Sequence, residues 1–83
     1  MCRNITTLRG LEPVATPEEI EAAARQYVRK VSGITKPSKV TEVRFEQAVA
    51  EIAAATTALL ADLPERRNPP PTLPPMRRGH THA

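Results

Sequence analysis

The sequence has few of the residues on which protein chemistry usually depends. It contains no tryptophan, one tyrosine, one phenylalanine, one cysteine, three glycines and two histidines in 83 residues. Both histidines, His80 and His82, lie near the C-terminus, so a histidine base inside a folded core is excluded. Glycine-rich phosphate loops, paired cysteines and zinc-binding histidine patterns are absent. We therefore expect no catalytic residue, no cofactor, no metal, no substrate pocket and no enzyme activity.

Cysteine content and hydropathy indicate the cellular compartment in which the protein is expected. A single cysteine, Cys2, excludes a framework of internal disulfides. No apolar run approaches the ~20 residues that a membrane span needs, and the N-terminus lacks a basic-then-apolar signal pattern. These features predict a cytoplasmic protein that makes no membrane contact. Removal of Met1 would leave Cys2 with a free thiol and amine, so a reactive N-terminus stays open beside the reading of an ordinary reduced thiol.

The stretch from Thr16 to Gly33 predicts a helix with both ends marked. Thr16 is a good N-cap residue, Pro17 suits the first helical position, and Glu19 completes a capping box. Gly33 is a natural left-handed stop. The apolar residues follow the helical period and form one stripe, made of Ile20, Ala23, Ala24, Tyr27, Val28 and Val31. A helix of this length needs a packing partner.

A second, longer helix is predicted from Thr41 to Leu63, with Ser38 or Thr41 as its cap. Its stripe consists of Phe45, Val49, Ile52, Thr56, Leu59, Leu60 and Leu63. Because the connector is short, the two helices should lie antiparallel, stripe against stripe. In this packing, Phe45 lies near Val28 and Val31, and Leu59 and Leu60 lie near Ile20.

The two ends of the chain differ in composition. Ile5, Leu8 and Leu11 have the spacing of a short helix or turn that caps the hairpin, although an extended segment is an alternative. Residues 64–83 contain six of the nine prolines and predict a tail that is extended or disordered and forms no packed element. The predicted fold is all-α: an antiparallel two-helix hairpin, capped by a short N-terminal helix or turn, in a domain of residues 1–63, followed by a proline- and arginine-rich flexible tail of residues 64–83.

Charge is segregated although its total is small. Residues 1–63 carry eight basic and eight acidic residues, and the tail contributes the net charge of +3. Between Arg25 and Arg44, however, there are six basic residues and one acid, Glu42. We expect the basic side of the first helix to have no partner within the chain and to continue into the loop. The candidate partner-binding residues are Arg25, Arg29, Lys30, Lys36, Pro37, Ser38 and Lys39.

The back of the second helix carries almost no charge. Its residues are small, namely Ala50, Ala54, Thr57, Ala58 and Ala61. A solvated helix face usually alternates charges. The pattern is that of an ordinary alanine-rich surface or of a face that docks a second copy of the chain.

Several stretches resemble an uncharacterised family of small bacterial proteins, a domain of unknown function. They are Met1-Cys2-Arg3-Asn4-Ile5, Leu8 to Pro13, Gln26 to Gly33, Lys36-Pro37-Ser38 and Ala48 to Leu60. The resemblance covers nearly all of residues 1–63, leaves the tail outside and implies no function.

The order of features also resembles the J-domain of co-chaperones. Leu8 to Pro13 takes the place of its short first helix, and Thr16 to Ile20 is similar to the start of its second helix, whose basic face contacts the chaperone. The J-domain loop carries His-Pro-Asp, whereas this loop carries Lys36-Pro37-Ser38. The resemblance therefore implies a helical hairpin with a basic face, and the missing His and Asp leave no basis for expecting stimulation of a chaperone ATPase.

The function that these features predict is binding. The first hypothesis is a non-enzymatic interaction module that holds an acidic protein surface through the basic helix face and loop. The alternative is association with nucleic acid or the ribosome, in which the arginine pairs Arg66/Arg67 and Arg77/Arg78 also neutralise phosphates. A third reading is that the basic residues form a solvated face only.

Overall fold

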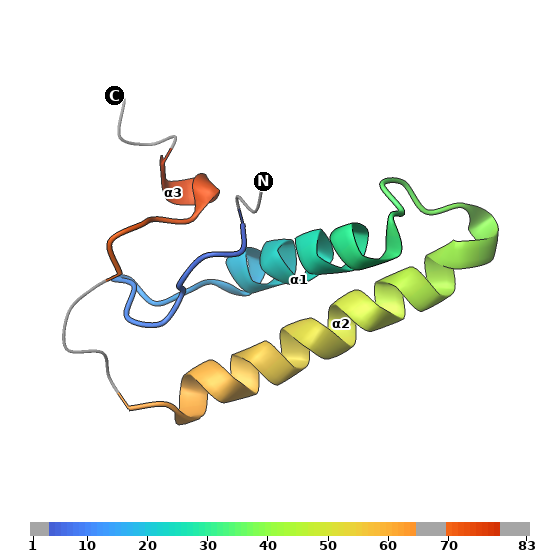
Figure 1. Cartoon of the computed structure of the whole chain (residues 1–83). Coiled ribbons are helices and arrows are strands. Elements are labelled where there is room, and N and C mark those ends of the chain that lie inside the picture. Colours follow the sequence, from blue (N-terminus) through green and yellow to red (C-terminus); the bar gives the residue numbers. More distant parts are fainter. Residues whose placement is uncertain (1–3, 65–69, 79–83) are drawn as a thin grey trace.

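A computed structural model describes residues 4–64 and 70–78 of the chain. These residues form three helices and no strand: α1 (Pro17–Ser32), α2 (Lys39–Asp62) and the short α3 (Pro75–Arg78). The predicted all-α hairpin is confirmed. Figure 1 shows α1 and α2 side by side and antiparallel, with the N-terminal segment and α3 at the end opposite the α1–α2 loop.

The end signals of α1 act as its sequence predicts. The Thr16 hydroxyl accepts a hydrogen bond from the Glu19 N–H (3.1 Å), and the Glu19 carboxylate accepts one from the Thr16 N–H (2.9 Å). At the other end, Gly33 has φ = 73°, and its N–H donates to the Arg29 carbonyl at 2.9 Å. Each bond satisfies a backbone group that a helix terminus would otherwise leave unpaired.

The second helix begins two residues earlier than predicted. Ser38 is the N-cap residue, and its N–H donates to the Thr41 hydroxyl at 3.0 Å. The two residues that the sequence offers as alternative caps thus act together. The helix ends at Asp62, and the Leu63 N–H still donates to the Leu59 carbonyl at 3.1 Å.

The core consists of two clusters. One lies between the helices and contains Ala24, Val28, Phe45 and Val49. The other contains Leu8, Leu11 and Ile20, with Leu60 packed against them. Residues 4–16 form turns and no helix, so the turn, rather than the short helix, caps the hairpin. Leu8 and Leu11 are buried as expected, whereas Ile5 is exposed.

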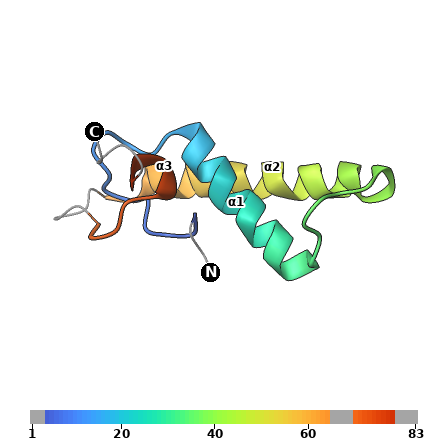
Figure 2. The same cartoon turned by 90° about the horizontal axis from the view of Figure 1, so that it is seen from above.

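Some residues of the predicted stripes lie outside the core. Tyr27, Val31, Leu59 and Leu63 are exposed, Val31 by 64% and Leu59 by 55%. Figure 2 shows that α1 crosses α2 obliquely, so the two stripes do not face each other along their whole length. On α2, Leu60 is half-buried and packs against the second cluster, whereas Leu59 lies at the flank of the stripe. The expectation that Val31 and Leu59 belong to the packed stripes was therefore wrong.

The tail prediction was also wrong for residues 70–78. Pro70 and Pro74 are buried, and Arg77 in α3 bonds to residues at the start of α1. Local composition predicts that such a segment buries little surface, but composition carries no information about contacts with residues far away in the sequence.

No helix in residues 4–64 and 70–78 has the length and hydropathy needed to cross a membrane.

Candidate functional site

Four of the five predicted basic residues lie toward the loop end of the hairpin. Arg29 and Lys30 lie in the last turn of α1, Lys36 lies in the loop, and Lys39 is the first residue of α2, whereas Arg25 lies in the middle of α1. The loop lies at the end of the molecule opposite α3 (Figure 1).

Arg25 differs from the others because it is already paired. Its Nη1 and Nη2 atoms each lie 2.8 Å from a carboxylate oxygen of Glu46, and Nη2 lies 3.3 Å from Glu21. The guanidinium carbon lies 5.9 Å from the centre of the Phe45 ring, within cation–π range. The Glu46 hydrogen bonds raise the pKa of Arg25, and the same contact lowers the pKa of Glu46. Arg25 therefore joins α1 to α2, and the expectation that it lacks a partner in the chain was wrong.

The other four cations are available. Arg29, Lys30, Lys36 and Lys39 are exposed, and none of them forms an ion pair among the described residues. Arg29 helps to lower the pKa of Glu46 by its charge, without a contact. Arg29 and Lys30 lie in the last turn of α1, where the helix dipole favours positive charge. We call Arg29, Lys30, Lys36 and Lys39 the basic strip.

The loop that carries the strip is held by local contacts. The Ser32 hydroxyl donates to the Val28 carbonyl (2.7 Å) and accepts from the Ile34 N–H (3.1 Å). Ile34 packs against the interhelical core cluster. Pro37 is half-buried, and Ser38 caps α2. Pro37 and Ser38 thus have structural roles that fix the loop between the charged residues.

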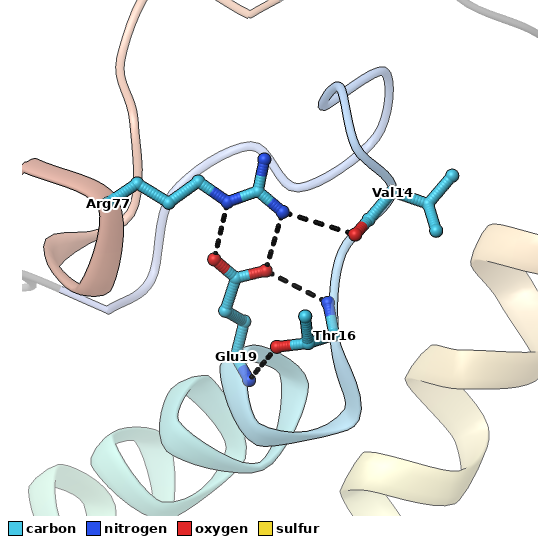
Figure 3. A network of polar contacts seen from close by, with 4 residues as sticks. All are labelled: Val14, Thr16, Glu19 and Arg77. Atoms are coloured by element: carbon cyan, nitrogen blue, oxygen red, sulfur yellow. Dashed lines mark hydrogen bonds and ion pairs between the residues drawn. The ribbon is translucent and has the colours of Figure 1, made fainter. Parts of the chain in front are cut away.

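A second polar network lies at the opposite end (Figure 3). The Arg77 Nε atom donates to Glu19 at 2.7 Å, and Nη2 donates to the other Glu19 oxygen at 3.0 Å and to the Val14 carbonyl at 3.1 Å. Glu19 is only 4% exposed, and the Arg77 hydrogen bond holds its pKa below the ordinary value although burial acts the other way. Arg77 thereby joins the tail, the N-terminal segment and α1.

Sequence reasoning misses this network. It assigns Glu19 to the capping box alone and treats Arg77 only as one of a pair of tail arginines. The two residues lie 58 positions apart, and each has an adequate local explanation. No periodicity or spacing connects them.

A cleft beside this network was also unexpected. It has a volume of about 570 Å³ and lies between the N-terminal segment, Ile20 of α1 and the C-terminal end of α2. At its edge, the Arg9 guanidinium donates two hydrogen bonds to the Pro64 carbonyl, at 2.8 and 3.1 Å. Periodicity predicts contact between the helices and gives no information about the space left at their ends, so the sequence did not indicate this cleft. Whether the cleft takes a substrate is not decided by its presence, and the expectation of no substrate pocket stays a prediction.

Three other predictions stay predictions: the absence of a metal, a reactive N-terminus at Cys2, and the docking of a second copy on the back of α2. Residues 4–64 and 70–78 contain no group of three side chains able to hold a metal ion. Cys2, His80 and His82 lie outside these residues. The small back of α2 is exposed at Ala50, Ala54, Thr57, Ala58 and Ala61, and its use by a second copy stays a prediction.

These observations define a small all-α protein built on a helical hairpin, with a basic end, a cleft at the other end and a C-terminal segment docked beside that cleft. Over residues 1–83 the sequence matches the family described as uncharacterized conserved protein (DUF2277), and the chain belongs to that family. The match includes the tail, which the resemblance of individual stretches had left outside. No curated protein and no solved structure matches the chain, so the resemblance to the J-domain stays a prediction.

Proposed function

We propose that the protein is a non-enzymatic interaction module of the bacterial cytoplasm that binds an acidic surface of a partner protein. The observation that supports the proposal is the basic strip: four exposed cations without an ion pair in the described parts of the chain, carried on one helix end and a fixed loop. Complementary charge of this kind raises the rate of association and selects the partner.

The state of Arg25 refines the proposed surface. Because Glu46 and Glu21 neutralise Arg25, this residue positions α1 on α2, and the partner meets Arg29, Lys30, Lys36 and Lys39. A fixed loop also lowers the ordering cost of binding, since fewer backbone states are lost.

Affinity purification with charge-reversal variants tests the proposal. Lys36→Glu and Arg44→Glu change the net charge equally, and both residues are exposed. By helical spacing from the buried Phe45 and Val49, Arg44 lies on the face of α2 that points away from α1. We expect Lys36→Glu to release the partner that co-purifies with the wild-type chain from its own cells, and Arg44→Glu to retain it.

Retention of the partner by Lys36→Glu would overturn the proposal, as would equal loss with Arg44→Glu, which would indicate a response to total charge. Circular dichroism on both variants controls for unfolding.

Association with nucleic acid is the second candidate. We rank it lower because one of the arginines that it would use to neutralise phosphates is already paired with an acidic side chain. Arg77 is bonded to Glu19, and the pair of aromatic residues in the sequence is too few for base stacking. Fluorescence anisotropy with duplex DNA and with RNA at ~50 mM salt provides the comparison. Tight binding that falls steeply with salt would favour nucleic acid over a protein partner.

A further inference from the structure

The cleft at the end opposite the basic strip has walls from three parts of the chain. Leu8 and Leu11 come from the N-terminal segment, Ile20 from α1, and Leu60 and Ala61 from α2. Its volume of about 570 Å³ lies within the range of roughly 300–1,000 Å³ that small-molecule sites occupy. The walls are mainly aliphatic, so the cleft suits an apolar body.

Arg9 places a positive charge at the edge of this aliphatic cleft. Its guanidinium reaches from the N-terminal segment to the Pro64 carbonyl, just beyond the end of α2. A guanidinium has five N–H donors, and Arg9 uses two of them on this carbonyl. Glu12 also lines the cleft, but Arg9 forms no ion pair with it or with another acid in the described ranges. Donors therefore remain at the cleft for an incoming acceptor.

A comparison with Arg77 shows what distinguishes Arg9. Arg77 also bonds to a backbone carbonyl, that of Val14, but its charge is balanced by the buried Glu19 carboxylate. Arg9 has the carbonyl without the carboxylate. Of these two guanidinium groups, Arg9 is therefore the one that can bind an external anion through a charge-assisted hydrogen bond.

An aliphatic body with one anionic group matches both the walls and Arg9.

We propose that the cleft binds a small anionic amphiphile, with its carboxylate or phosphate group at Arg9 and its aliphatic chain along Leu60, Ala61 and Leu63, over the buried Leu8 and Ile20. The proposal does not depend on the basic strip, which lies at the other end of the hairpin. Carboxylate and phosphate share the chemistry that Arg9 recognises, and separate probes distinguish them.

Calorimetric titration of the full chain with four ten-carbon probes, each below its micelle concentration, tests the charge requirement. Decanoate or decyl phosphate should bind saturably with one site per chain. Decanol and decyltrimethylammonium should bind at least about tenfold more weakly, because they cannot accept charge-assisted hydrogen bonds from Arg9. Shortening the better anion by two carbons should weaken binding by about tenfold.

Three variants test the location. Arg9→Leu should weaken binding of the better anion by about tenfold or more. Ala61 and Ala54 are both exposed alanines of α2, but only Ala61 lines the cleft. Ala61→Trp should therefore block binding, whereas Ala54→Trp should leave it unchanged. Thermal unfolding of each variant verifies that the chain is folded.

The proposal is overturned if neither anion binds saturably, if the cationic probe binds as well as the anionic ones, or if Ala54→Trp weakens binding as much as Ala61→Trp. Unchanged binding by a folded Arg9→Leu variant would also overturn it. Amide chemical-shift changes confined to the lining residues would support the assignment, and changes confined to the α1–α2 loop would contradict it.

Discussion

Truncation of Phe45 and Leu59 to alanine should have very different effects, although the sequence places both residues on one stripe. Phe45 is 4% exposed and packs with Ala24, Val28 and Val49. Leu59 is 55% exposed. Periodicity alone would give both residues a role in the core, whereas the structure buries Phe45 and leaves Leu59 at the flank of the stripe.

The expected magnitudes follow from burial. Phe45→Ala removes a buried ring, which costs about 3–5 kcal/mol of unfolding free energy when the surroundings relax only partly. It also removes the surface beneath the Arg25 guanidinium. Leu59→Ala should cost less than about 1 kcal/mol, because the side chain is already largely in water. At roughly 0.05–0.15 kcal/mol per residue, an 83-residue chain has a total stability of about 4–12 kcal/mol. Phe45→Ala therefore removes between about a quarter and all of this stability.

Urea and thermal unfolding followed by circular dichroism measure both changes. Under two-state unfolding, a loss of about 3 kcal/mol lowers Tm by about 12–24 °C in a chain of this size. Phe45→Leu is the matched control, since retaining most of the volume should reduce the cost to about 1.5 kcal/mol or less. Equal destabilisation by Phe45→Ala and Leu59→Ala would refute the described packing and restore the simple stripe-to-stripe arrangement.

Three further predictions concern the helix ends and the ion pairs. Arg77 holds the Glu19 pKa below its ordinary value, so this pair stabilises the fold above about pH 4. The stabilisation is lost as the pH falls through the lowered pKa. Thermal unfolding between about pH 2 and 7 should therefore depend less on acid in Glu19→Gln than in wild type, and identical profiles would contradict a stabilising Glu19–Arg77 ion pair. Gly33 has φ = 73°, and a β-carbon added to it would meet no atom within 4 Å, so Gly33→Ala should lower the unfolding free energy by about 1 kcal/mol through backbone strain alone, a change that urea denaturation resolves. Arg25→Gln should lower Tm by an amount that shrinks as NaCl approaches about 1 M, and a Glu46→Gln variant combined with it in a double-mutant cycle should show coupling; additive effects would mean that the pair contributes nothing.

The helices and their caps were predictable because their causes are local. Thr16, Glu19 and Gly33 act within one turn of the chain, and the structure shows the bonds that their types and spacing predict. The start of α2 was missed by two residues because Ser38 and Thr41 are both adequate caps, and only the folded loop shows that they bond to each other.

The candidate site was predictable only in part. The positions of the cations were evident from charge segregation, but the sequence could not tell paired from unpaired ones. Glu46 reaches Arg25 from the other helix, 21 positions away, and that contact depends on how the helices are rotated and crossed. The same reasoning explains why Arg9 was not singled out: its significance arises from a cleft that exists only after folding.

The sequence by itself determined the fold class, the two long helices, the turn between them and the basic character of one end, because these follow from hydrophobic period, cap residues and charge order within short windows. Tertiary structure alone decided which apolar residues are buried, which of the described arginines pair with an acid and where the C-terminal segment docks. Those outcomes depend on the crossing of α1 over α2 and on contacts such as Glu19 with Arg77, 58 residues apart, and no local pattern encodes either.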